Sequence, residues 1–225
     1  MTPSKRTPAM SAGLNEADII EALLKKDEFK KWGFVIYRCT YQNNSDWEKF
    51  MARFLKEVTN HLESYSGLDL LDTYTPTVLE DPSFEGATAA TLREHFNQWA
   101  KTSLKEEQGV PENYRAANGR YRFFIAVDQE AMESVLNVPE DSDIDETGFV
   151  RMIYGEWEPE VLDEEDIANG HETEAEEPIE GCTLHDVGWM KMSWRWVVLP
   201  GFHKMRSWDD WETYYARPPE IGDID

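Results

Sequence analysis

The sequence predicts an α+β protein with a mainly antiparallel sheet and with helices packed on one face. Segments with helical spacing of apolar residues are interspersed with short β-branched and aromatic segments. The last two predicted strands are joined without a helix, which favours an antiparallel pair. Aromatic residues make up 12% of the 225-residue chain, and they can build a core despite its acidity. We expect a ferredoxin-like arrangement with added elements.

The first half of the chain contains the clearest helix. Its predicted elements are a helix over 16–29, a strand over 33–41, a helix over 46–65 and a strand over 70–79. Asn15 is a suitable N-cap for the first helix, and Ser45 with Glu48 forms a capping box before the second. Apolar side chains recur at helical spacing along the second helix. Pro76 weakens the strand over 70–79, because proline cannot donate a ladder hydrogen bond.

The second half alternates short helices and strands. Its predicted elements are a helix over 88–103, a strand over 120–127, a short helix after Asp128, strands over 148–157 and 186–199, and a short helix after Ser207. Tyr121 and Phe123 fall on one face of their strand, and Arg122 and Phe124 fall on the other. The last helix ends before Pro218, since proline does not continue a helix.

The acidity is concentrated in one quarter of the chain. The formal net charge is −23, and residues 128–186 contain 21 acids against the single base Arg151, which leaves only −3 for the rest. Within that segment, a loop over 155–181 has 12 acids and neither lysine nor arginine. We expect a single domain over 14–217, between a disordered tail over 1–13 and a C-terminal tail over 218–225.

Composition excludes several classes of partner. Nucleic acid needs clustered lysine and arginine, and an anionic membrane surface repels an acidic chain. The sequence lacks both an apolar run of transmembrane length and an N-terminal signal peptide, so we expect a cytoplasmic protein. With two cysteines, no disulfide framework is expected.

Two segments resemble a known group of proteins. They are WGFVIYRCTY at 32–41 followed by DWEKF at 46–50, and RYRFFIAVD at 120–128. Both are similar to segments of a large group of uncharacterised proteins from filamentous ascomycete fungi, and the similarity extends loosely over most of the chain. The resemblance implies a fungal, intracellular protein. It brings no known activity and no catalytic residues.

No motif fixes a reaction. Cys182 and His185 have the spacing of metal ligands, but no further ligands are evident, so we expect no metal and no cofactor. One alternative is a cofactor-free enzyme of fungal secondary metabolism, namely an isomerase, cyclase or dehydratase. Its candidate catalytic residues are His95, Tyr121 and Asp128, because such reactions need one positioned acid or base.

The most informative pattern is a set of cations and tryptophans on or beside the predicted strands. If the strand faces align, the second surface of the sheet carries aromatic side chains together with several cations. The predicted binding residues are Arg38, Arg122, Arg151, Lys191, Arg195, Trp157 and Trp189. Arginine forms paired hydrogen bonds with carboxylates, and aromatic rings supply stacking. The pattern predicts a binding domain for a small acidic or aromatic molecule, or for a peptide.

The sequence leaves alternatives open for these charges. The strand arginines either bind a ligand, solubilise an open sheet face, or pair with the acidic loop over 155–181. That loop is itself a candidate docking segment for a basic protein partner. No feature of the sequence indicates an oligomeric state.

Overall fold

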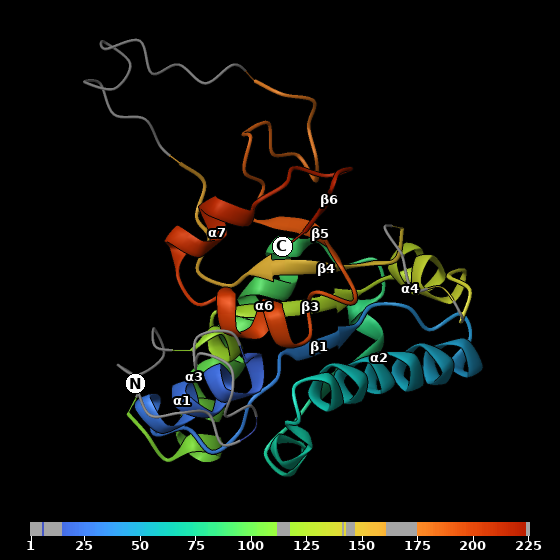
Figure 1. Ribbon diagram of the computed structural model, residues 1–225. Coiled ribbons are helices and arrows are strands. Elements are labelled where there is room, and N and C mark those ends of the chain that lie inside the picture. Colours follow the sequence, from blue (N-terminus) through green and yellow to red (C-terminus); the bar gives the residue numbers. More distant parts are fainter. Residues whose placement is uncertain are drawn as a thin grey trace.

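A mixed β-sheet forms the centre of the molecule (Figure 1). The computed structural model describes residues 6, 15–111, 118–140, 142, 147–160 and 175–223. Within them the sheet has six strands in the order β2-β1-β3-β4-β5-β6. The strands are β1 (Val35–Arg38), β2 (Thr77–Glu80), β3 (Phe123–Val127), β4 (Phe149–Tyr154), β5 (Trp189–Ser193) and β6 (Ile221–Gly222).

The strand directions confirm the α+β class and correct one detail. The pairs β1/β2, β1/β3 and β5/β6 are parallel, whereas β3/β4 and β4/β5 are antiparallel. The sheet is therefore mixed rather than mainly antiparallel, and a ferredoxin-like topology is not confirmed. The parallel pairs β1/β2 and β1/β3 arise because α2 (Asn44–Ser64) and α3 (Ala89–Gln108) are crossover connections between β1, β2 and β3.

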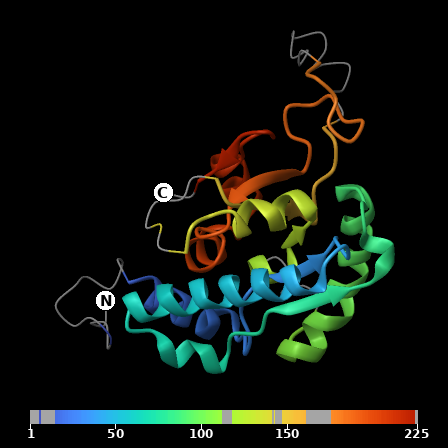
Figure 2. The ribbon, with the colours of Figure 1, turned by 90° about the vertical axis from the view of Figure 1, so that its right-hand side faces the viewer.

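Helices cover both faces of the sheet, which corrects the expected single helical layer. The main hydrophobic core includes residues of α1 (Glu16–Asp27), α2, α4 (Gln129–Leu136), α6 (Leu199–Lys204) and α7 (Trp208–Tyr214). A second cluster lies on the opposite face, where Leu92 and Phe96 of α3 pack with Tyr37 and Phe124. Figure 2 shows α3 on the other side of the strands from α1 and α6. Helix α3 therefore covers part of the second face, which is not an open surface.

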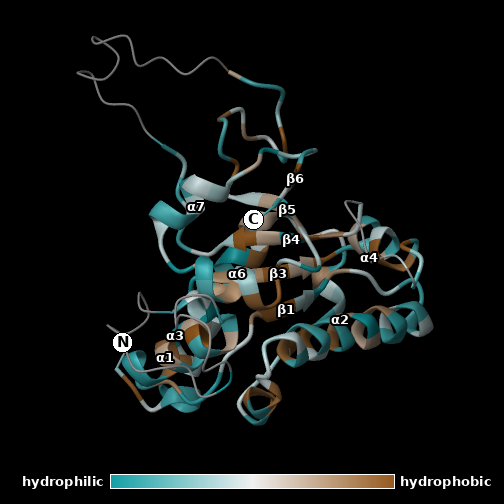
Figure 3. Ribbon diagram, viewed as in Figure 1, coloured by the Kyte–Doolittle hydropathy of each residue, from teal (hydrophilic) through white to brown (hydrophobic). Residues whose placement is uncertain are grey.

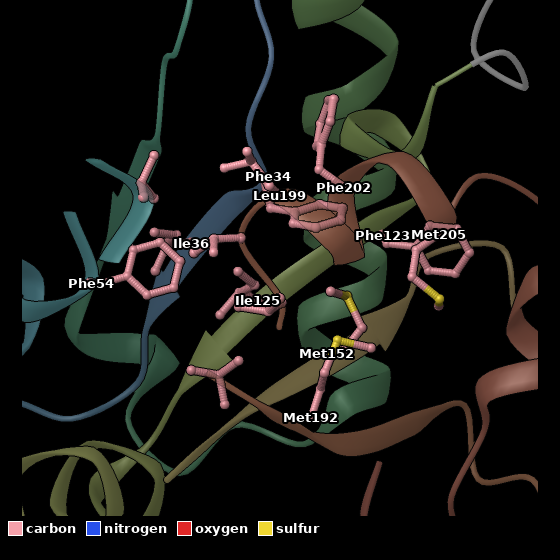
Figure 4. Close-up of a cluster of buried hydrophobic side chains, with 14 of the residues drawn as sticks. Phe34, Ile36, Phe54, Phe123, Ile125, Met152, Met192, Leu199, Phe202 and Met205 are labelled. Carbon is pink, nitrogen blue, oxygen red and sulfur yellow. The ribbon is translucent and has the colours of Figure 1, made fainter. Parts of the chain in front are cut away.

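The larger core follows the alternation of the strands. Figure 4 shows its centre, where strand side chains meet residues of α2 and α6 and of the segment after α6. The labelled residues are Phe34, Ile36, Phe54, Phe123, Ile125, Met152, Met192, Leu199, Phe202 and Met205. In Figure 3 the central strands are mainly hydrophobic, while α2 carries both hydrophobic and hydrophilic residues, as an amphipathic helix does.

Several predicted boundaries move in the structure. Asn43, rather than Ser45, caps α2, because its side-chain oxygen accepts hydrogen bonds from the amides of Ser45 and Asp46. A 3₁₀ helix, η1 (Leu68–Asp72), replaces the start of the predicted 70–79 strand, so β2 begins after Pro76. The predicted strand over 186–199 ends at Ser193, and α6 follows it.

The predicted tails also differ. Part of the C-terminal tail forms β6, which pairs with Lys191 and Met192 of β5. In the predicted N-terminal tail only Arg6 is described, and its guanidinium lies 2.6 Å from Asp18 and 2.7 Å from Glu21. The rest of the 1–13 tail lies outside the described residues, as does 161–174 of the predicted acidic loop. Among the helices that the structure describes, none is long and apolar enough to cross a membrane.

Candidate functional site

The register of the sheet brings three predicted binding residues together. Arg151 of β4 is paired with Lys191 of β5, and Ile153 is paired with Trp189. Paired residues and residues two positions apart share a face, so Arg151, Lys191 and Trp189 project from the same surface as Tyr37. This is the surface that the first turns of α3 cover beside them.

Arg151 is the buried centre of this cluster. Its side chain is 10% exposed, and its guanidinium carbon lies 4.0 Å from the centre of the Trp189 ring. Nη2 donates to Oε1 of Glu180 at 2.5 Å, and Nη1 makes a longer contact of 3.4 Å with Oδ2 of Asp128. Two buried donors, Nε of Arg151 and Nε1 of Trp189, have no hydrogen-bond acceptor among the described residues. The cluster therefore has unused capacity to bind an acceptor.

Glu180 comes from the predicted acidic loop and completes the site. Ile179 and Cys182 form an isolated antiparallel bridge, and the two residues between them, Glu180 and Gly181, have φ angles of 49° and 85°. This tight turn places the Glu180 carboxylate over the sheet, where Oε2 accepts from the amide of Ala89 at 2.7 Å. Ala89 is the first residue of α3, and helix N-termini favour negative charge. One carboxylate thus bridges a buried arginine and a helix N-terminus.

A cavity of about 800 Å³ reaches this cluster at Trp189 and Lys191, whereas Arg151 and Glu180 are not among its described lining residues. Trp189 and Lys191 contribute from the sheet, and segments 176–179 and 215–220 contribute from the loops. The ammonium of Lys191 lies 2.7 Å from Glu130 and 4.2 Å from the centre of the Phe149 ring. The Glu130 side chain is 69% exposed, so water screens this ion pair and Lys191 can exchange its partner.

The remaining predicted cations lie elsewhere, so the prediction that all of them share one surface of the sheet is wrong. Arg38 is on the opposite face, where it contacts the rings of Tyr41 and Trp47 at the start of α2. Arg122 precedes β3 and donates to the Tyr154 hydroxyl at 2.9 Å. The alternation was correct, but the sheet register and the strand ends separate these side chains.

Two more predicted binding residues are also apart from the cluster. Arg195 follows β5 and donates to the carbonyl of Ser142 at 2.6 Å. Trp157 follows β4, and the guanidinium of Arg93 lies 4.8 Å from its ring centre. Trp157 lines a different cavity, which holds no lysine or arginine among its described lining residues.

The candidate catalytic residues do not converge. The Tyr121 hydroxyl donates to Glu107 at 2.8 Å, and burial raises the pKa of this phenol far above its usual range. His95 bonds the Tyr37 hydroxyl through Nδ1 at 2.8 Å, and Asp128 caps α4 by accepting from an amide. None of the three cavities described in this structure has any of these candidates among its lining residues.

A further group near the cluster was missed by the sequence prediction. Cys39 is buried on the same face as Arg151, and burial raises the pKa of its thiol to about 12. The thiol therefore stays protonated at neutral pH and is a poor nucleophile. For Glu180, the only signal in the sequence was the Glu180-Gly181 pair, which indicates a turn. Nothing in the sequence signalled which arginine that turn reaches.

No metal centre is evident in the described ranges. Among these residues, no group of three or more histidine, cysteine, aspartate or glutamate side chains is placed to hold an ion. His185 instead contacts Glu176 through Nδ1 at 2.7 Å.

No protein-family model, curated protein or solved structure matches the chain. The resemblance to fungal proteins therefore stays a prediction, and the site rests on its own geometry.

Proposed function

We propose that this protein is a binding domain that holds a small aromatic carboxylate against Arg151, Trp189 and Lys191. The observation that carries the proposal is the position of the Glu180 carboxylate. It already lies between the Arg151 guanidinium and the first amide of α3, so the environment suits a carboxylate. An external carboxylate would bind there in exchange for Glu180.

The chemistry around Arg151 supports an aromatic acid over other ligands. Arginine bonds carboxylates with two parallel donors, and here Nε is available beside the engaged Nη2. The indole of Trp189 offers a second buried donor and an aromatic wall. The neighbouring cavity of about 800 Å³ lies within the range that small-molecule sites occupy.

Binding is favoured over catalysis by the groups near the cluster. The Cys39 thiol stays protonated, and Asp128 is engaged as a helix cap and as a partner of Arg151. No observation favours the cofactor-free enzyme, since its candidate residues are separated. The proposed activity is therefore reversible capture of a ligand, without a covalent step.

Isothermal titration calorimetry with benzoate, indole-3-acetate and the uncharged benzamide tests the proposal. We expect the two acids to bind and benzamide not to bind. Arg151→Met and Lys191→Met should each weaken binding by about tenfold or more, because each removes a charge-assisted hydrogen bond.

Lys105→Met is the matched control. Lys105 is an exposed cation of α3, sixteen residues from Ala89 and thus roughly 24 Å along the helix from it. Its loss should leave binding unchanged, and circular dichroism should verify that every variant is folded. The proposal is overturned if neither acid binds the wild-type protein, or if Arg151→Met and Lys105→Met have equal effects.

A further inference from the structure

A second cavity differs from the first in its walls and its charge. Its volume is about 510 Å³, and it lies where the chain leaves β4 and where α7 begins. Four aromatic residues line it: Tyr154, Trp157, Trp208 and Tyr215. Trp208 is 50% exposed, the largest exposure among the exposed large hydrophobic residues described.

Packing and hydrogen bonds hold two of the four aromatic walls, Trp157 and Tyr215, in place. Trp157 packs against Gly188, where an added Cβ would lie only 2.5 Å from the indole ring. Arg93 lies over the same indole, and it donates to the carbonyls of Tyr154 and Gly188. The Tyr215 hydroxyl is fixed between the Val187 amide and the His185 carbonyl, at 3.0 and 2.9 Å. The Trp157 and Tyr215 rings therefore lose little conformational entropy when a ligand binds.

The charge of the cavity is strongly negative. Five carboxylates line it, and the described lining contains neither lysine nor arginine. Glu156 is paired with Arg122, but Glu158, Glu160 and Glu212 have no cationic partner among the described residues. Aromatic faces attract cations through their quadrupoles, and the carboxylates add a direct Coulomb attraction. Arg93 above Trp157 is an internal example of such a contact.

We propose that this aromatic cavity binds an arginine or lysine side chain of a basic protein segment. Charge complementarity points to a segment rather than a single free cation. Five carboxylates line the cavity, so a segment that carries several cations neutralises more of this charge than one monovalent cation does. This site is separate from the proposed carboxylate site and does not depend on it.

The test uses calorimetry with a hexa-arginine peptide, a Gly-Ser peptide of equal length and tetramethylammonium chloride. We expect the arginine peptide to bind, the Gly-Ser peptide not to bind, and tetramethylammonium to bind much more weakly. Trp208→Ala should weaken peptide binding by about fivefold, whereas Trp208→Phe should retain most of it, because the phenyl ring still offers a face to the cation.

Two double variants separate the cavity from the overall charge. Glu158→Gln/Glu160→Gln removes two charges at the cavity. Glu94→Gln/Glu106→Gln removes two exposed charges on α3, outside the cavity lining. We expect the first pair to weaken binding several-fold more than the second. Equal losses, an unchanged affinity in Trp208→Ala, or tetramethylammonium binding as tightly as the peptide would each overturn the proposal.

Discussion

Arg120 and Arg151 are both buried, yet their hydrogen bonding differs. Arg120 is fully buried, and all three of its guanidinium nitrogens donate hydrogen bonds. Their acceptors are the carboxylate of Glu107, the carbonyls of Gly33 and Thr75 and the hydroxyl of Thr77. Arg151 has one short bond to Glu180, one long contact to Asp128, and an unused Nε.

The difference separates a structural arginine from a candidate binding arginine. Arg120 joins β2 and the segment before β1 to α3, and each of its guanidinium nitrogens already donates to a described residue. Arg151 is held by acids that are themselves partly exposed, with side-chain exposures of 28% for Asp128 and 26% for Glu180. Burial alone does not mark a site. The decisive feature is a buried charge whose bonding is incomplete and whose partners can exchange with solvent.

The largest expected effect tests this difference directly. Arg120→Met should lower the free energy of unfolding by about 3–5 kcal/mol, because it leaves the partly buried Glu107 carboxylate without its cation. Arg151→Met should cost only about 1–2 kcal/mol, since its acidic partners can turn to water. Urea denaturation of both variants measures the two values. Equal losses would contradict the assignment of different roles.

The second prediction concerns competition between Glu180 and a ligand. Glu180→Gln removes the internal carboxylate charge from Arg151 and should raise the affinity for benzoate by about tenfold, equivalent to about 1.4 kcal/mol. Calorimetry measures the change. Glu106→Gln removes an exposed carboxylate near the end of α3 and outside the cavity lining, so it is the control and should leave the affinity nearly unchanged. A lower affinity in Glu180→Gln would mean that Glu180 helps to form the site instead of competing for it.

The third prediction uses the ion pair of Arg120. Burial alone would raise the pKa of Glu107, but the hydrogen bond and charge of Arg120 outweigh it and lower the pKa. Because the folded pKa lies below the unfolded value of about 4.3, the stabilisation is complete above that pH and is lost as the pH falls through the folded pKa. In Glu107→Gln the acid-induced loss of stability should be smaller by roughly 1 kcal/mol.

Urea denaturation between pH 7 and pH 3 measures this effect. Glu94→Gln serves as the control, because Glu94 is exposed and has no ionic partner among the described residues. Its stability should fall with acid as in the wild type. An identical acid dependence in Glu107→Gln and the wild type would show that the Arg120 pair does not carry the stabilisation.

The last prediction tests whether α3 covers the second face of the sheet. At pH 8 a thiol reagent should modify Cys182 at least on the order of 100-fold faster than Cys39, because the Cys39 thiol is buried and protonated. Single Cys→Ser variants assign the two rates. Rapid modification of Cys39 in the folded protein would indicate that α3 does not cover this face.

Local features of the chain were predictable from the sequence. Asn15, Asp128 and Ser207 cap helices as expected, because a cap depends only on the next three residues. The alternation of 123–127 is also confirmed, since its period is a property of the strand itself. The same rule failed at Ser45, because the preceding Asn43 caps the helix two residues earlier.

The candidate site was predictable only in part. Arg151, Lys191 and Trp189 were predicted as binding residues, and the sheet places them on one face. Arg38 and Arg122 were grouped with them because alternation says which face a residue takes only relative to its own strand. It does not say how strands are ordered, or at which end of the sheet a residue lies.

The sequence by itself determined the α+β class, the helix caps, the core-facing positions of the strands and the concentration of acidic residues, because each depends on neighbours a few positions away. Tertiary structure alone decided the parallel crossovers, the position of α3 over the second face, and the contact of Glu180 with Arg151. These features join segments that are far apart in the chain. They depend on the packing of the whole molecule, which no local pattern encodes.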